Sequence, residues 1–128
     1  MEAKDYILLL LSVGNQKPVY GALFLQLEVY LLVREIIPDL QKELEFKPSD
    51  IGVYSENLIK IINELKHNDL INIETIDNTV TYSITETGES YINPISFPPG
   101  VRGKIRNLKR GSDRLGFRGL LRFIKYYY

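Results

Sequence analysis

Residues 55–92 carry the pattern that most limits how this chain can fold. Ser55 has the side chain of a good N-cap, and behind it apolar residues recur at three- and four-residue spacing. This spacing predicts an amphipathic helix over residues 55–68, with one face buried and the other in solvent. The apolar positions are Leu58, Ile61, Ile62 and Leu65.

A β-hairpin is expected directly after this helix. Residues 71–76 and 79–84 are rich in isoleucine, threonine, valine and tyrosine, which favour strands. The pair Asp77 and Asn78 between them tolerates the positive φ angles that a tight two-residue turn requires. Thr85 then has the position and side chain of the N-cap of another helix.

The residues before this unit predict two more helices. Residues 3–12 are mostly apolar, as in a buried helix, and residues 22–37 form a second helix that Pro38 ends. The segment 16–20 allows at most a short edge strand. Residues 46–53, with a proline and a glycine, are expected to be extended chain. The apolar breadth of helix 22–37 predicts burial between layers or at a dimer contact.

Composition narrows the chemistry. The 128 residues include no cysteine and one histidine, so we expect no catalytic residues, no metal site and no cofactor. The acidic Glu2 and Asp5 do not fit the start of a signal peptide, and the longest apolar run contains Gln26 and Glu28. We therefore predict a cytoplasmic protein that does not span a membrane.

The quoted segments resemble known families. ITETGESYI, residues 84–92, is similar to the exit from the wing of winged helix-turn-helix domains. LQ at Leu25, FKP at Phe46, GVYS at Gly52 and LLRF at Leu120 resemble segments of phage-associated winged-helix proteins and of the related Panacea antitoxin domain. The resemblance implies an α+β, mainly helical fold: a three-helix core, a two-stranded wing and a C-terminal basic helical tail.

Charge is divided unevenly along the chain. Residues 1–100 contain seven Lys/Arg and fifteen Asp/Glu, whereas residues 101–128 contain nine Lys/Arg and one Asp. Together with the proline-rich segment NPISFPPG, this division predicts a winged-helix domain over residues 1–92, a linker over 93–100 and a basic tail over 101–128. The tail is expected to meet a polyanion or an acidic protein surface.

The helix at 55–68 occupies the place of a recognition helix, which contacts base edges in the major groove of DNA. Its outward face also carries two glutamates, so a purely structural helix is the alternative. The hairpin tip is acidic, which argues against DNA contacts there. The candidates for base contact on this helix are Asn57, Lys60, Asn63 and His67.

The basic tail supplies the candidates for phosphate contact. Its arginines recur every four residues, a spacing suited to a stripe along a helix. A break is expected near Gly111, where Ser112 would cap a second tail helix. One alternative is that the arginines pair with the acidic part of the chain, residues 1–100, or with a neighbouring subunit. Another is that the tail lies on an anionic membrane surface. The candidates are Arg102, Lys104, Arg106, Lys109, Arg110, Arg114, Arg118, Arg122 and Lys125.

These observations predict a DNA-binding winged-helix protein that regulates transcription, binds double-stranded DNA and forms a homodimer. The alternative is a protein-interaction module, an adaptor or antitoxin-like domain without direct DNA binding, because winged helices serve both purposes. No enzymatic activity is expected.

Overall fold

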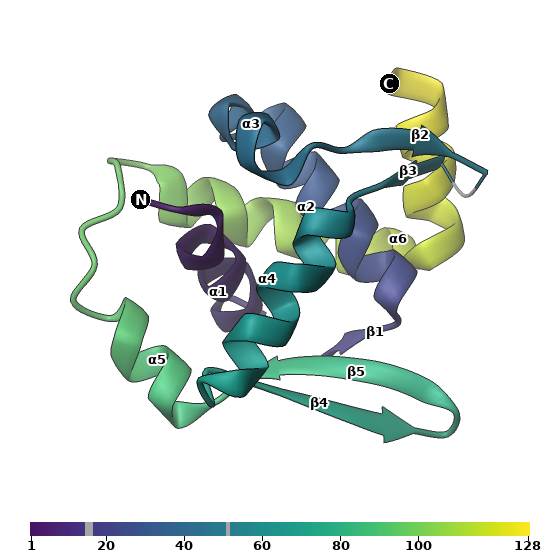
Figure 1. The fold of residues 1–128 in the computed structure, drawn as a ribbon. Helices are drawn as coiled ribbons and strands as arrows, with labels where there is room; N and C mark the ends of the chain where they lie inside the picture. The colour runs from purple at the N-terminus through teal and green to yellow at the C-terminus, as the bar shows by residue number, and fades with distance from the viewer. Residues whose placement is uncertain (15–16, 51) are drawn as a thin grey trace.

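The computed structural model describes residues 1–14, 17–50 and 52–128, and these form an α+β, mainly helical fold (Figure 1). The elements are α1 (Ala3–Ser12), β1 (Val19–Tyr20), α2 (Ala22–Glu35), the 3₁₀ helix η1 (Pro38–Leu40), α3 (Gln41–Leu44), β2 (Lys47–Ser49), β3 (Gly52–Tyr54), α4 (Glu56–His67), β4 (Ile71–Ile76), β5 (Thr79–Ile84), α5 (Glu86–Ile92) and α6 (Val101–Tyr127).

The hairpin predicted at residues 71–84 is confirmed. Strands β4 and β5 pair antiparallel from Ile71 opposite Ile84 to Ile76 opposite Thr79. Both turn residues have positive φ, 50° at Asp77 and 65° at Asn78. The short strand β1 adds to the other edge of β5, which gives the sheet order β1-β5-β4.

The helix caps predicted at Ser55 and Thr85 are confirmed. The Ser55 hydroxyl accepts a hydrogen bond of 3.0 Å from the Leu58 N–H at the start of α4. The Thr85 hydroxyl accepts one of 2.9 Å from the Gly88 N–H at the start of α5. Such caps satisfy N–H groups that have no partner within the helix.

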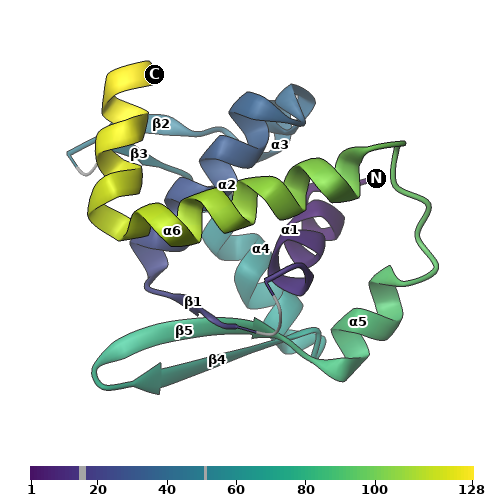
Figure 2. The same ribbon diagram turned by 180° about the vertical axis from the view of Figure 1, so that it is seen from behind.

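The segment between α2 and α4 has more structure than the extended chain expected over residues 46–53. The strands β2 and β3 pair antiparallel, with Lys47 opposite Tyr54. Residue 51 of the expected extended chain and residue 16 of the predicted edge strand lie outside the residues that the structure describes. In the folded chain, this hairpin lies against the C-terminal end of α6 (Figures 1 and 2).

The predicted break in the tail near Gly111 is wrong. Helix α6 continues through Gly111 and Ser112 and bends at Gly116, whose φ of 71° and ψ of 180° are not helical. Ser112 is not a cap, because its hydroxyl donates a hydrogen bond to the Glu28 carboxylate on α2. The bend divides α6 into a first arm, residues 101–115, and a second arm, residues 117–127.

Both arms of α6 pack into the same apolar core as α1 and α2. Helix α2 lies in the middle of the molecule, with α4 on one side and α6 on the other (Figures 1 and 2). The apolar breadth of α2 predicted burial between layers or at a dimer contact, and packing within the chain accounts for it. The buried side chains of α6 are Val101, Ile105, Lys109, Ser112, Leu120 and Ile124.

Candidate nucleic-acid interface

The solvent side of α6 forms a strongly basic surface, which we call the basic face. In the first arm, Arg106, Arg110 and Arg114 are exposed, and each lies about 40° around the helix from the one before. Around the helix they lie about 100°, 140° and 180° from the buried Ile105. The second arm repeats the arrangement around the buried Leu120. The basic face consists of Lys104, Arg106, Arg110, Arg114, Arg118, Arg122 and Lys125.

Carboxylates of the chain do not neutralise the basic face. In residues 1–14, 17–50 and 52–128, the only ion pairs join Lys4 to Glu2 and Lys109 to Glu28 and Asp113. The alternative that the tail arginines pair with acidic residues of the same chain is therefore not supported by any ion pair in this part of the chain. Arg102 is partly buried instead, with its guanidinium 5.0 Å from the centre of the Phe97 ring.

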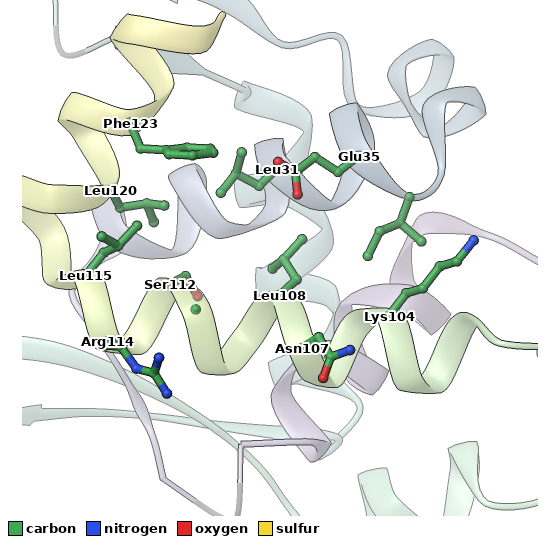
Figure 3. A pocket seen from close by; sticks show the side chains of 12 residues that line it. Leu31, Glu35, Lys104, Asn107, Leu108, Ser112, Arg114, Leu115, Leu120 and Phe123 are labelled. Atoms are coloured by element: carbon green, nitrogen blue, oxygen red, sulfur yellow. The ribbon is translucent and has the colours of Figure 1, made fainter.

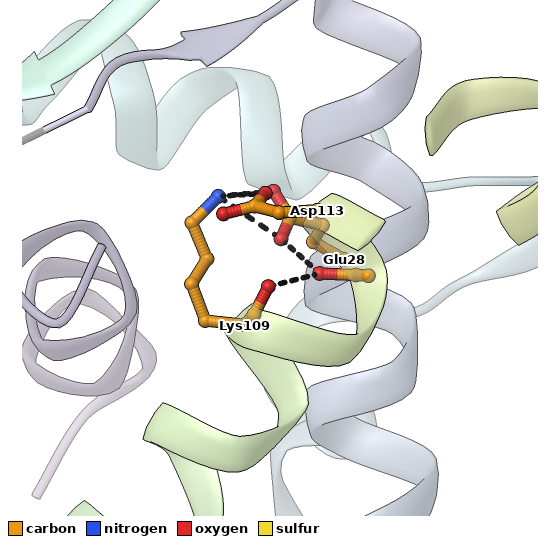
Figure 4. A network of polar contacts seen from close by, with 4 residues as sticks. Glu28, Lys109 and Asp113 are labelled. Carbon is orange, nitrogen blue, oxygen red and sulfur yellow. Dashed lines mark hydrogen bonds and ion pairs between the residues drawn. The ribbon is translucent and has the colours of Figure 1, made fainter. Parts of the chain in front are cut away.

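Lys109 was predicted to contact DNA, but it lies inside the protein with 2% of its side chain exposed. Its ammonium group donates hydrogen bonds of 3.0 and 3.1 Å to the Glu28 carboxylate and of 2.9 Å to Asp113 (Figure 4). Ser112 donates a further hydrogen bond to Glu28. The network fixes α6 on α2. The signal in the sequence was Glu28, an acid in the middle of an apolar helix.

Burial controls the protonation of this network. Removal of Glu28 from water raises the pKa of its carboxyl, while Lys109 and the hydrogen bond from Ser112 oppose that rise. A carboxylate at this depth is stable only with such partners. The ion pair thus accounts for Lys109 as a structural residue.

The four candidates on α4 are divided between structure and solvent. The Asn57 amide donates hydrogen bonds of 2.9 Å to the Glu43 carbonyl and to the Glu45 carboxylate, so it joins α4 to α3. Lys60, Asn63 and His67 are exposed. Of the four candidates on α4, these three project into solvent.

The surface around α4 and the hairpin β4–β5 is acidic. Residues 56–80 expose five carboxylates and two lysines. The carboxylates belong to Glu56, Glu64, Asp69, Glu74 and Asp77, and the lysines are Lys60 and Lys66. Such a surface repels the phosphates of DNA.

The α4 and α6 candidates lie on opposite sides of the molecule. Figure 1 shows α4 in front of α2 and α6 behind it, and the reverse view in Figure 2 brings α6 to the front. The fold therefore does not bring the predicted recognition helix and the basic face to one continuous surface.

A pocket of about 600 Å³ lies inside the bend of α6. Figure 3 shows Leu31 of α2 facing Leu108 of the first arm, with Leu120 and Phe123 of the second arm at one end and Lys104 at the other. The pocket separates the two arms along one side. Leu115, next to the bend, lines the pocket and is 48% exposed.

Comparison of the chain with protein-family models, curated proteins and solved structures finds no match. Residues 1–14, 17–50 and 52–128 contain no helix long and apolar enough to cross a membrane. The same residues contain no group of three His, Cys, Asp or Glu side chains that could hold a metal ion.

Proposed function

We propose that this protein is a winged-helix DNA-binding protein that regulates transcription and holds the phosphate backbone of duplex DNA with the basic face of α6. The observation that carries the proposal is the set of seven exposed, unpaired cations of the described chain on the solvent side of one bent helix. A polyanion releases counterions when it meets such a surface, which favours binding.

The order of the elements supports the winged-helix part of the proposal. Helix α1, strand β1, helices α2 and α4, and the hairpin β4–β5 follow one another as in the three-helix core and wing that the sequence resembles. The η1, α3 and β2–β3 elements form an insert between the second and third core helices. The insert is longer than the turn of a simple helix-turn-helix.

The proposal assigns affinity to α6 and does not assign base contacts to α4. A straight duplex along α6 is separated from α4 by the body of the protein. Asn57 is also engaged with α3. Binding should therefore depend weakly on DNA sequence, because phosphate contacts carry no sequence information.

Replacement of Arg106, Arg110 and Arg114 by alanine tests the proposal. We expect weaker binding to every duplex of equal length, and a slope of log K against log salt that shrinks by roughly 0.9 for each contact removed. Fluorescence anisotropy over a salt series measures both quantities.

The matched control replaces three exposed lysines outside α6, Lys42, Lys60 and Lys66, by alanine. This variant loses the same charge but should keep the salt slope of the wild type. Equal slopes for the two triple variants would contradict the proposal, as would the absence of binding by the wild type at low salt.

The alternative function, a protein-interaction module, is favoured by a different surface. The acidic region around α4 also exposes apolar side chains, including Ile59 with 41% accessibility. Apolar groups surrounded by charges are typical of protein contacts.

A further inference from the structure

We propose that the bend of α6 docks into a crevice beside α4 of a second copy of this chain, so that molecules associate head to tail. The inference goes beyond the proposed function and does not require DNA binding. It rests on two complementary surfaces that one molecule cannot bring together by itself.

The first surface is the elbow of α6, residues 114–118. Gly116 turns the chain there. The flanking Phe117 is 39% exposed, and Leu115, at the end of the pocket inside the bend, is 48% exposed. Arg114 and Arg118 border this apolar pair. Arginine and aromatic side chains are the residues that most often contribute large shares of binding energy at protein interfaces.

The second surface is a crevice of about 200 Å³ between α2, α4 and the hairpin β4–β5. Ile59, Ile73 and Tyr82 line it, and Asn63 lies at its polar side. Val80 is 36% exposed and extends the apolar surface. It lies on the same face of the hairpin as Tyr82, because residues two apart on a strand share a face. The crevice has room for apolar side chains of a partner.

The regions that contain the two surfaces have opposite net charge. The elbow includes Arg114 and Arg118 of the basic face, whereas residues 56–80, which supply Ile59, Asn63 and Ile73 to the crevice, expose five carboxylates and two lysines. Electrostatic complementarity of this kind favours an orientation and accelerates encounter. Contact between two basic faces would instead oppose like charges, so a two-fold dimer through α6 is disfavoured.

The positions of the surfaces determine the type of assembly. Helix α6 lies on the side of α2 opposite to α4 (Figures 1 and 2), so the elbow does not reach the crevice of its own chain. Each molecule then offers one elbow and one crevice. Contacts between two different surfaces continue as open chains unless their rotation closes a ring.

Sedimentation velocity of the full chain tests the proposal. In about 0.1 M salt, where charges interact over ~10 Å, the mean sedimentation coefficient should rise steadily with protein concentration. In about 1 M salt the charges are screened beyond ~3 Å, and the coefficient should fall toward that of the monomer. A monomer at all concentrations up to about 100 µM in low salt would overturn the inference.

A mixture of two variants, one with a disabled crevice and one with a disabled elbow, tests whether the elbow docks into the crevice. Ile59→Lys puts a cation at the crevice, and Leu115→Ser with Phe117→Ser removes the apolar part of the elbow. Each variant alone should be monomeric, but an equimolar mixture should form a dimer and nothing larger, because one intact elbow then meets one intact crevice. A mixture that stays monomeric, or a variant that still forms chains alone, contradicts the proposal.

Matched controls separate docking from general loss of apolar surface. Ile76→Ser changes a residue that is 42% exposed on the opposite face of the hairpin, and Tyr126→Ser changes a more exposed aromatic residue of α6. Both controls should associate like the wild type. If an elbow or crevice variant unfolds, Arg114→Gln with Arg118→Gln and Glu56→Gln with Glu64→Gln replace them, with about tenfold weaker association expected from each pair.

The DNA experiment remains separate. The Leu115 and Phe117 variant keeps every cation of the basic face, so its DNA affinity should equal that of the wild type. Lost self-association with retained DNA binding supports docking, and failure of DNA binding leaves the mixture experiment unaffected. Duplex DNA added to the wild-type protein should dissociate the head-to-tail assemblies, because DNA competes with the crevice for the basic face.

Discussion

At the scale of single residues, the ion pair between Glu28 and Lys109 has the largest expected effect. Lys109→Met leaves a buried carboxylate without its cation, and loss of one member of a buried pair costs about 3–5 kcal/mol of unfolding free energy. Urea denaturation followed by circular dichroism measures the loss. Glu28→Leu combined with Lys109→Met should recover most of it, since neither charge is then buried.

The pH dependence of the Lys109→Met variant follows from the same contact. Burial already raises the pKa of Glu28 above its ordinary 4.5, and Lys109 opposes the rise. A group with a raised folded-state pKa contributes stability below its ordinary pKa, and that contribution is lost as pH rises through the raised value. The deficit of the variant should therefore be smaller at about pH 5 than at about pH 8. A deficit independent of pH would contradict a charged, unpaired Glu28.

Gln26 and Ser55 illustrate a contact that residue patterns alone do not reveal. They belong to two of the segments quoted for the family resemblance, and the Gln26 amide exchanges two hydrogen bonds of 2.9 Å with the backbone N–H and C=O of Ser55. Gln26→Leu should cost about 1–3 kcal/mol for each backbone group left unsatisfied. Chemical denaturation measures this, and the exposed Asn63→Ala control should change stability by less than about 0.5 kcal/mol.

At the scale of elements, local patterns predicted α4 and the β4–β5 hairpin because the determinants are local. Apolar spacing, the caps at Ser55 and Thr85, and two turn residues that accept positive φ all lie within the segment. The bend of α6 could not be predicted in this way. Gly111, Gly116 and Gly119 are equivalent in sequence terms, and contacts of Ser112 with α2 decide that the helix continues past Gly111.

Gly116 and Gly111 should respond oppositely to replacement by alanine. Gly116 has φ 71° and ψ 180°, a conformation that essentially only glycine adopts, so Gly116→Ala should destabilise the protein by about 1–3 kcal/mol. Gly111 is helical, with open space around an added methyl group, and Gly111→Ala should stabilise by about 0.5–1 kcal/mol. Thermal unfolding compares them; equal shifts would mean that the bend is not fixed at Gly116.

At the scale of the whole molecule, the predicted domain division implies that residues 1–92 fold without residues 101–128. The burial of α6 leads us to expect the opposite. Ile105 and Leu120 are fully buried against the rest of the core, and Glu28 finds its cation on α6. A chain of residues 1–100 should show little cooperative unfolding in a thermal melt, whereas a chain of residues 1–125, which keeps all of these side chains, should retain it. A cooperative transition in the shorter chain would restore the predicted domain division.

The candidate site was predictable only in part, because its arrangement depends on contacts between segments that are far apart in the sequence. The charge count identified α6 as basic, but which of its cations is buried depends on a partner 81 residues away in the sequence. The separation of α4 from the basic face likewise depends on how α6 crosses α2. Long-range packing of this kind leaves no local periodic signal.

The burial of α6 also determines when the protein can fold during synthesis. A ribosome that has translated residues 1–100 has produced an α2 whose second side is uncovered and a Glu28 whose lysine does not yet exist. The nascent chain must hold this apolar surface open until Leu120 and Ile124 have emerged. Folding of this domain is therefore completed only after residues 120–124 have emerged, and the incomplete chain presents the kind of exposed surface that chaperones bind.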